Sequence, residues 1–504
     1  MNVGRRGEVT EAAAAERGER SRRLLAAFAA RRDPLVLGVT AAAASAVVVL
    51  LSWPGYMTRD SYDQLEQART LELTDHHPVV MSLLWRYLDQ VVPGPLGMLI
   101  FMSVLFWAGL AALFLTFRRP LLLRVAAMLV VGFFPPVLVI EGAVWKDTLM
   151  QAALLASAGC LVLFLRTRRR ALLGLGVLAC TLASVTRHNG FAATWPFLML
   201  PWLAAPGLRR LRWPARLAAA ASAALVSTVV TTALVLQLLG SFTQRESFWQ
   251  LIASFDLAGI SVNTGHTVFD RRSPVLRRGA SLADLERCYQ PSNHLPLYRG
   301  CPHPSQAGQA PLLSRVSAPA ELASLASNWR RAVLAEPVGY LRHRYDVYRL
   351  VIGLTTHGAS LNYDSLFSAT DYPLSSTARS VQAWIAPLAS TPLFRVWIYV
   401  ALALATALTA VPFHRRAGSA LPLVFAVSSL SYSSSLFFAA GARDYRYSAW
   451  TVLASVLALL AFAAPGRLRP ASRAPASPGS PRDPGTPASA RGEATAPRLT
   501  TRTG

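Results

Sequence analysis

The segment 54–94 carries side chains that can exchange protons or hold a phosphate group. Asp60 lies only a few residues after an apolar run that ends at Trp53. A carboxylate at that position could accept a proton from a hydroxyl group, as a general base must. The alternative is an ordinary loop carboxylate that caps a helix over 61–69. Asp60 is therefore a candidate catalytic residue.

The second motif of this segment is Asp75-His76-His77-Pro78. Adjacent histidines before a proline can bind a metal ion or a phosphate group, or shuttle protons near neutral pH. The same residues also fit the start of a helix, with Pro78 near its first turn and Asp75 or His77 as its cap. Both interpretations can hold together, and Asp75, His76 and His77 are candidate substrate-binding residues.

Lys146 is the only lysine among the 50 lysines and arginines of the chain. So strong a bias indicates that arginine replaced lysine wherever a guanidinium would serve. The remaining lysine suggests a role for a compact point charge, such as contact with a phosphate or an ion pair in a tight space. The alternative is chance, and we favour function because Trp145 and Asp147 beside it belong to a predicted outer segment.

Two arginine motifs could complete a site for an anion. They are Arg187-His188-Asn189-Gly190 and Arg443-Asp444-Tyr445-Arg446-Tyr447. Guanidinium groups match phosphate oxygens in a bidentate geometry. The simpler interpretations are a helix cap for the first motif and arginines that extend to a membrane interface for the second. With Lys146, these motifs predict a cationic ring for an anionic headgroup, formed by Arg187, His188, Arg443 and Arg446.

The composition places these motifs in a membrane protein. Hydrophobic residues make up 53% and charged residues only 15% of the chain, whereas soluble chains carry about 25% charged residues. The apolar residues come in runs long enough to cross a bilayer. We therefore predict an all-α polytopic membrane protein with about ten transmembrane helices. The predicted spans are 35–53, 96–116, 121–140, 148–165, 171–186, 191–207, 217–239, 396–413, 419–440 and 447–464.

The net charge of +24 is distributed in arginine clusters between the apolar runs. No basic stripe is interleaved with aromatic residues, which argues against nucleic acid as a partner. The clusters follow the positive-inside rule, and this predicts a cell-membrane protein with both termini in the cytoplasm. The outer face then receives 54–94, 141–147, 187–190, 240–395 and 441–446, which hold nearly all candidate site residues.

The predicted organisation has five parts. The tails 1–34 and 465–504 are cytoplasmic, and their composition is typical of disordered segments. A membrane core of about seven helices covers 35–239. An extracytoplasmic segment, 240–395, separates this core from three further spans in 396–464.

The outer segments contain two predicted helices and a cysteine pair. Residues 79–92 fit a helix in the membrane interface or, equally, a short buried helix, and 319–335 fit a helix in the large segment. Cys288 and Cys301 lie in that segment, where a disulfide is the natural interpretation. The nearby histidines leave a zinc site as the alternative, although their spacing matches no standard one: these are His294 and His303.

These motifs resemble those of the C-type (GT-C) membrane glycosyltransferases, and protein O-mannosyltransferases and aminoarabinose transferases are similar. The shared features are a long first outer loop and an acidic residue, Asp60, shortly after the first helix. Asp75-His76-His77-Pro78 resembles an Asp-x-His-Pro-like element before an interfacial helix. Glu141 and Asp147 resemble acidic residues of the second outer loop.

The resemblance covers about residues 35–240 and the rest loosely. The elements 145–147, 187–190 and 444–447 look like those of a bacterial branch of that fold. Two features depart from the pattern. Arg59-Asp60-Ser61 stands where mannosyltransferases carry an Asp-Glu pair, and the large outer segment precedes the last three spans.

The resemblance implies transfer of a sugar from a polyprenyl-phosphate carrier to an envelope glycan, lipid or protein on the outer face. Asp60 would deprotonate the acceptor, and Lys146 with arginines would stabilise the leaving lipid phosphate. A divalent metal ion held by Glu141 or Asp147 is an optional addition, because cationic side chains could do the same work. No other cofactor is predicted.

Two other functions fit the same residues. A transporter or flippase of lipid-linked sugars would use the cationic ring but would need a route across the bilayer. The few charges inside the spans weigh against an ion-coupled carrier. A non-catalytic membrane scaffold would need neither. Sugar transfer by the purified protein separates the enzyme from both alternatives.

Overall fold

The computed structural model describes residues 32–301, 310–355, 359–361, 371–417 and 420–464. Every regular element in these residues is a helix, and the extended chain forms only isolated bridges. The predicted all-α class is therefore confirmed for the described residues. The two predicted tails fall almost entirely outside them.

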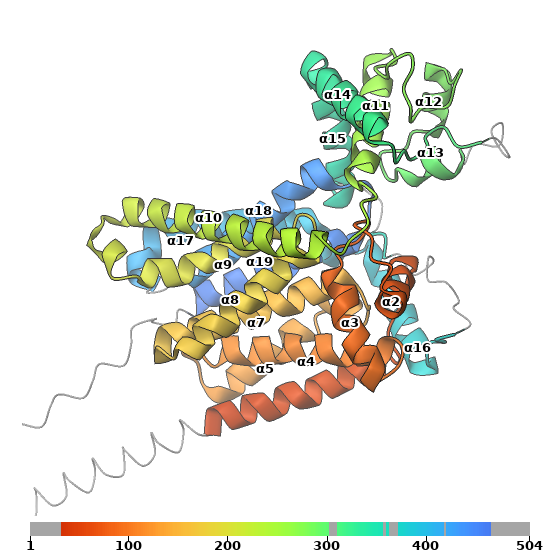
Figure 1. Cartoon of the computed structure of the whole chain (residues 1–504). Helices are drawn as coiled ribbons and strands as arrows, with labels where there is room; N and C mark the ends of the chain where they lie inside the picture. The colour runs from red at the N-terminus through yellow and green to blue at the C-terminus, as the bar shows by residue number, and fades with distance from the viewer. Residues whose placement is uncertain (1–31, 302–309, 356–358, 362–370, 418–419, 465–504) are drawn as a thin grey trace, which may run out of the picture.

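The helices form two parts that Figure 1 separates clearly. A helical body contains the long apolar helices, and a lobe of shorter helices extends from one end of it. The lobe consists of α11 (Trp249–Thr264), α12 (Leu282–Cys288), α13 (Leu295–Arg299), α14 (Pro319–Ala335) and α15 (Pro337–Val351). The body consists of a first helix (Arg32–Leu51), α2 (Arg59–Thr70), α3 (Val80–Val91), α4 (Pro95–Phe114), α5 (Leu121–Gly132), α6 (Pro135–Glu141), α7 (Lys146–Thr167), α8 (Arg170–Thr186), α9 (Phe191–Ala204), α10 (Trp213–Gly240), α16 (Ser376–Ile385), α17 (Val396–Ala417), α18 (Leu421–Ala439), η6 (Tyr445–Ser448) and α19 (Ala449–Ala463).

Among the described residues, six helices are long and apolar enough to cross a membrane, or seven if the bent pair α5–α6 is one span. The six are the first helix, α4, α7, α10, α18 and η6–α19 together. Each predicted span contains an apolar helix, but α8, α9 and the described apolar part of α17 are shorter. The predicted number of about ten spans is therefore not confirmed.

Proline explains the break between α5 and α6. α5 ends at Gly132, α6 begins at Pro135, and the two helices meet at a bend of 65°. Proline lacks the amide proton that would continue the helix, and its ring excludes the helical conformation of the residue before it. The span predicted at 121–140 is therefore two helices. α9 contains Pro196 and Pro201 within only 14 residues.

Small residues let α4 and α7 approach closely in the body. A Cβ atom on Gly109 of α4 would lie 2.6 Å from the backbone nitrogen of Ala156, and one on Gly159 of α7 would lie 2.6 Å from the Cβ atom of Ala112. Neither place accommodates a side chain, so the close contact requires glycine. This contact fixes α7, which begins at Lys146.

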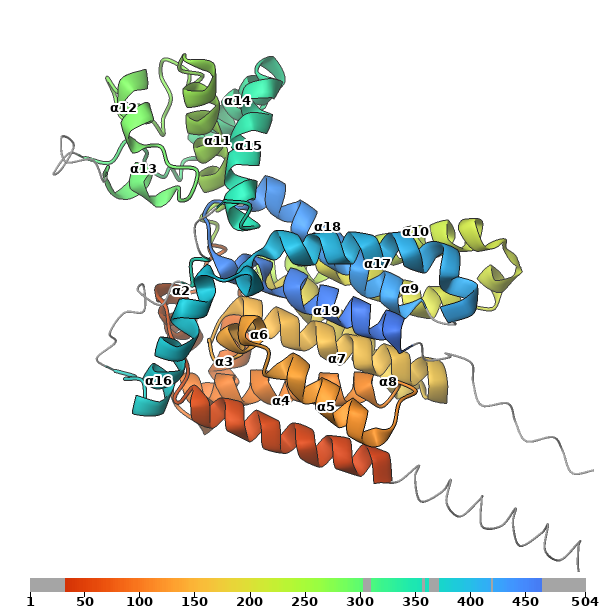
Figure 2. The ribbon, with the colours of Figure 1, turned by 180° about the vertical axis from the view of Figure 1, so that it is seen from behind.

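The arginine clusters and the candidate site residues lie at opposite ends of the body. Figures 1 and 2 show that the described chain begins and ends at the end away from the lobe. The connections α4–α5, α7–α8 and α9–α10, which carry arginine clusters, lie at that same end. Which end faces the cytoplasm stays a prediction.

The segment 54–94 folds over the lobe end of the body as α2 and α3. α3 turns Trp85 into the interior and leaves Tyr87 and Val91 exposed. The helix predicted at 79–92 is confirmed, and one of its faces, which includes Ser82, is buried. Its location in a membrane interface stays a prediction.

A buried carboxylate, Asp256 of α11, organises the lobe. Its Oδ1 atom lies 3.1 Å from Nε2 of His343 and 2.6 Å from Nη2 of Arg344. Its Oδ2 atom accepts a hydrogen bond of 2.9 Å from the indole of Trp329. Arg344 also donates to the carbonyl of Ala440 at the end of α18, at 3.0 Å. The network joins α11, α14 and α15 to one another and to the body.

A disulfide bond joins Cys288 and Cys301 within the lobe. Nδ1 of His294 lies 2.8 Å from the carbonyl oxygen of Gly441 and must donate to it. His303 lies outside the described residues. Because Cys288 and Cys301 are joined to each other, neither has a free thiolate that could bind zinc, which was the alternative interpretation.

Candidate functional site

A large cavity with many charged residues in its lining lies between the helical body and the lobe. Its volume is about 2380 Å³, whereas typical small-molecule sites occupy about 300–1,000 Å³. Its walls come from α2, the α6–α7 and α8–α9 connections, the lobe and the segment before α19. The fold brings all predicted catalytic and substrate-binding residues to this one cavity: Asp60, Asp75, His76, His77, Lys146, Arg187, His188, Arg443 and Arg446.

Thr58 begins α2 and places Asp60 in the first turn of that helix. Thr58 and Ser61 form a capping box, in which the amide of Thr58 donates to Oγ of Ser61 at 3.2 Å. A carboxylate in the first turn is favourable, because the free amides there carry partial positive charge. The cap is Thr58 and not Asp60, which leaves the Asp60 side chain to face the cavity.

Hydrogen bonds tie the start of α2 to the start of α7. The amide of Tyr56 donates to the carbonyl of Gly142, and the amide of Val144 donates to the carbonyl of Tyr56, both at 2.9 Å. Oγ of Ser61 donates to the carbonyl of Val144 at 2.8 Å. These bonds hold Asp60 beside Lys146.

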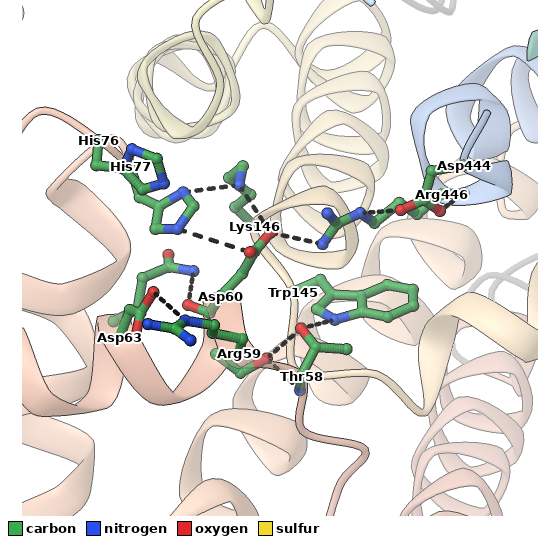
Figure 3. Close-up of polar contacts among 12 residues, drawn as sticks. Thr58, Arg59, Asp60, Asp63, His76, His77, Trp145, Lys146, Asp444 and Arg446 are labelled. Atoms are coloured by element: carbon green, nitrogen blue, oxygen red, sulfur yellow. Dashed lines mark hydrogen bonds and ion pairs between the residues drawn. The ribbon is translucent and has the colours of Figure 1, made fainter. Parts of the chain in front are cut away.

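Asp60 is surrounded by three nitrogen-bearing side chains (Figure 3). Its Oδ2 atom lies 2.8 Å from Nη1 of Arg446 and 3.6 Å from Nζ of Lys146. Its Oδ1 atom lies 3.8 Å from Nε2 of His77. Burial alone would raise the pKa of Asp60, but the charges of Arg446 and Lys146 hold it well below its usual range. Asp60 is therefore ionised in this structure. It is a weak base as long as Lys146 and Arg446 both contact it.

His77 lies between Asp60 and Lys146 and is neutral. Its burial, followed by the nearby Lys146 ammonium, holds its pKa well below the usual value. Nζ of Lys146 lies 3.0 Å from Nδ1 of His77, and an ammonium group can only donate, so Nδ1 carries the lone pair. The ring proton is then on Nε2, which faces Asp60.

Arg446 bridges two carboxylates. Its Nε atom lies 2.7 Å from Oδ2 of Asp444, while its Nη1 atom contacts Asp60. The guanidinium lies over the rings of Trp145 and Tyr447, 5.2 Å and 5.4 Å from their centroids. The planar guanidinium group of arginine forms hydrogen bonds at its edge while its face stacks on aromatic rings. The ammonium group of lysine cannot do both.

The two predicted metal ligands do not face the cavity. Asp147 is buried and forms an ion pair with Arg187. Glu141 is buried at the end of α6, away from the cavity lining. No group of three or more His, Cys, Asp or Glu among the described residues is arranged to hold a metal ion. The predicted metal site therefore lacks support. The sequence alone did not show that Asp147 is paired with Arg187.

Asp75 links the first loop to the lobe. Its Oδ1 atom accepts hydrogen bonds from the amides of Glu246 and Ser247, at 2.6 Å and 3.1 Å. Its own amide donates to the carbonyl of Gln244 at 3.0 Å. Its carboxylate thus positions the chain that leads into α11, and a contact with substrate stays a prediction.

His76 and His188 meet at Phe248. The rings of His188 and Phe248 stack at 5.3 Å with an angle of 14°, and His76 meets Phe248 edge-on at 5.4 Å. All three line the cavity. They form an aromatic surface suited to the apolar face of a bound ring. It lies beside Asp60, His77, Lys146 and Arg446, which we call the Asp60 cluster.

Further arginines line the cavity from the lobe and from the segments beside it. Arg443 is placed there by its amide, which donates to the carbonyl of Ser292 at 2.7 Å. One of the lobe arginines, Arg315, is paired with Glu246 at 3.2 Å. Because acidic residues such as Asp63 and Glu66 also line the cavity, only a local group of cations favours an anionic ligand. These cavity-lining arginines are Arg245, Arg299, Arg315, Arg330 and Arg443.

Comparison with known proteins leaves the function to be argued from this geometry. No family model, curated protein or solved structure matches the chain. The resemblance to the GT-C enzymes thus rests on the sequence motifs alone.

Sequence reasoning did not single out several residues that shape the site. Trp145 and Asp444 stand inside motifs that drew attention for their neighbours, so those motifs were the available signal. Phe248 and Glu246 lie in a stretch without a motif. Only the folding of the lobe against the first loop brings these two to the cavity.

Proposed function

We propose that this chain is an integral membrane glycosyltransferase that moves a sugar from a polyprenyl-phosphate carrier to an acceptor. The observation that carries the proposal is one carboxylate, Asp60, held by Lys146 and Arg446 at the wall of a large cavity. The cavity lies at one end of a bundle of long apolar helices. This placement suits a donor whose lipid tail lies in a bilayer and whose headgroup enters the cavity.

The apolar helices would place the body in the cell membrane. The six long helices and the bent pair would span it, and α8, α9 and α17 would complete about ten spans. The arginine clusters at the end away from the lobe favour that end as cytoplasmic. Both termini would then lie in the cytoplasm, and the cavity would face outward.

The donor phosphate would bind between Lys146 and Arg446. Both cations already face one anionic oxygen, Oδ2 of Asp60, so the local field is suited to negative charge. A phosphate offers several oxygens, which would accept from the fork of Arg446 and from the point charge of Lys146.

Transfer requires one bond to form and one to break. The acceptor hydroxyl oxygen bonds to the anomeric carbon, and the bond from that carbon to the phosphate oxygen breaks. The lipid phosphate leaves with the electron pair, and the hydroxyl proton passes to Asp60. Lys146 and Arg446 stabilise the charge that develops on the leaving phosphate.

Phosphate binding would also turn Asp60 into a stronger base. In the structure Lys146 and Arg446 hold the pKa of Asp60 well below its usual range, against the effect of burial. A phosphate shares these cations and adds negative charge beside Asp60, and both effects raise the pKa of that carboxyl. Donor binding and activation of the base would be coupled.

The size and charge of the cavity suit two substrates at once. A volume of about 2380 Å³ exceeds the roughly 1,000 Å³ of a large single-ligand site. The part of the cavity lined by Asp60, Lys146 and Arg446 would bind the donor headgroup. The part of the cavity lined by the lobe would take the acceptor, which could be an envelope glycan, lipid or protein.

The decisive experiment is transfer by the purified protein in lipid vesicles. The donors are polyprenyl phosphates that carry a radiolabelled hexose or pentose, and the acceptor is an extract of the cell envelope. Label transfer that Asp60→Asn abolishes supports the proposal. Movement of donor across the vesicle without transfer would favour a transporter, and the absence of both would favour a scaffold.

A further inference from the structure

An exposed apolar stripe runs along the edge of the lobe, outside the cavity. Leu334 at the end of α14 exposes 82% of its surface, and Val338, Leu341 and Tyr345 of α15 expose 61%, 52% and 55%. The spacing of the three α15 residues places them on one face of the helix. None of the four lines the cavity. We refer to these four residues as the α15 stripe.

The opposite face of α15 is packed tightly inside the lobe. His343, Arg344 and Val347 are buried, and a Cβ atom on Gly339 would lie 2.6 Å from Cγ2 of Thr264 in α11. α15 therefore has one face closed by the lobe and the other left open.

An exposed cation, Arg342, follows Leu341 of the α15 stripe in the sequence. Arg342 is exposed between Leu341 and Tyr345, and no ion pair within the described residues includes it. Asp346, one residue beyond Tyr345, is already paired with Arg349 at 3.0 Å. Aliphatic residues with a tyrosine and an arginine at their edge are typical of a helix at the interface between lipid and water.

The position of α15 points to the same partner. Figures 1 and 2 show α15 on the side of the lobe that faces back along the long helices, with the lobe extending sideways beyond the body. The nearby α10 has only 17% of its apolar span buried. Lipid that covers α10 would therefore extend toward the side of the lobe on which α15 lies.

We infer that the α15 stripe rests on the surface of the membrane and that Arg342 binds lipid phosphates there. The inference rests on the membrane location in the proposed function, and it does not depend on sugar transfer. The contact holds α15 and α11 at a fixed height above the lipid. Because α11 and Asp256 organise the lobe, the contact also positions the lobe wall of the cavity above the bilayer.

Spin labels on the whole protein in lipid nanodiscs test this contact. The discs contain phosphatidylcholine and phosphatidylglycerol, and Cys160 and Cys180 are replaced by alanine. One label is placed at Val338→Cys, one at Val229→Cys on the exposed side of α10, and one at Glu286→Cys on the exposed side of α12. Collisions with oxygen report lipid, and collisions with a nickel chelate report water.

We expect the Val338 label to behave like the Val229 label, accessible to oxygen and protected from nickel, while the Glu286 label does the reverse. A nickel-accessible Val338 label beside a protected Val229 label overturns the docking and leaves the membrane location intact. A nickel-accessible Val229 label overturns the membrane location itself. Protection from both reagents with spin–spin broadening would show a second copy on the stripe, which also overturns the inference.

Arg342→Glu tests the phosphate contact separately. We expect it to raise nickel accessibility of the Val338 label roughly fivefold, the factor that corresponds to about 1 kcal/mol for one basic residue near an anionic membrane. Unchanged accessibility would remove Arg342 from the contact. A neutral exchange at the paired Arg349, Arg349→Gln, serves as the matched control.

Discussion

Nζ of Lys146 lies 3.0 Å from Nδ1 of His77 and 3.6 Å from Oδ2 of Asp60, so one cation is shared between an imidazole and a carboxylate. The only lysine of the chain thus occupies the centre of the Asp60 cluster. Because an ammonium can only donate, His77 must present its lone pair to Lys146. A second proton on His77 would add a positive charge directly beside that ammonium.

Acid should destabilise the protein through His77. Burial and then Lys146 hold the pKa of His77 well below 6.5 in the folded protein, while the unfolded chain titrates near that value. Below about pH 6.5 the unfolded state binds the extra proton and the folded state does not. The free energy of unfolding therefore falls as pH falls, by at most about 1.4 kcal/mol per pH unit.

Melting temperatures in detergent between about pH 7 and about pH 5 measure this effect. His77→Asn should reduce the dependence, because the amide oxygen can still accept from Lys146 but takes up no proton. Other buried histidines with a lowered pKa, such as His188 and His294, keep their share of it. His266→Asn, at an exposed histidine of the lobe side, is the matched control. An equal flattening in both variants would contradict the assignment to His77.

Asp60→Asn should lower sugar transfer by at least ~10²-fold, because the amide cannot accept the acceptor proton. Transfer rates in vesicles measure the loss, and the melting temperature checks that the variant is folded. Asp63→Asn is the matched control, since Asp63 lies on the same helix, lines the same cavity and faces Arg59 at 4.0 Å. Full activity in Asp60→Asn would move the general base elsewhere.

The Cys288–Cys301 disulfide should stabilise the lobe. The two residues are separated by 13 positions, and closing a loop of that length contributes about 3 kcal/mol to the free energy of unfolding. Cys288→Ser with Cys301→Ser should lower the unfolding free energy by about that amount, and peptide mass spectrometry without reduction should find the native pair joined. Cys160→Ala, at a free cysteine of the body, should change little.

Local sequence patterns predicted the helices and much of the site, because both depend on short-range chemistry. The apolar runs around α4 and α7 became single helices, and 319–335 became α14. Asp60 and Lys146 stood out by position and composition, and they lie together because Tyr56 and Val144 bond through their backbones.

Tertiary pairing was beyond the sequence. Asp256 stands alone as a charge inside the apolar stretch of α11, and its partners Trp329, His343 and Arg344 come from two later helices. Asp147 offered a plausible metal ligand until Arg187 was seen to hold it. In each case the partner lies too far along the chain for any local spacing to reveal it.

The proposed orientation predicts which side of the membrane each end of the body faces. A membrane-impermeant thiol reagent applied to intact cells should label Glu72→Cys, at an exposed residue of the first loop, and spare Thr167→Cys, at an exposed end of α7. The arginine clusters at the α7–α8 end are the physical reason. The reverse labelling pattern would contradict the predicted topology, and therefore also the prediction that the cavity faces outward.

Lys146→Arg should lower sugar transfer nearly as much as Lys146→Ala, by at least ~10-fold, which corresponds to about 1.4 kcal/mol in the barrier. Only 13% of the lysine side chain is exposed. Arg446 already occupies the far side of the same Asp60 oxygen. A second guanidinium is wider than an ammonium and directs its donors in a plane, so it cannot meet His77 and Asp60 in this space.

The measurement is transfer rate against donor concentration, with membrane expression determined in parallel. The loss should appear in the use of donor, since Lys146 is proposed to hold its phosphate. Arg59→Lys exchanges the same two residue types at a cavity position that is exposed and faces Asp63 at 4.0 Å. Because a loosely held cation tolerates either shape, this control should keep its activity. A fully active Lys146→Arg enzyme would show that any cation serves at this position, and Lys146 would then owe its place in the cluster to chance.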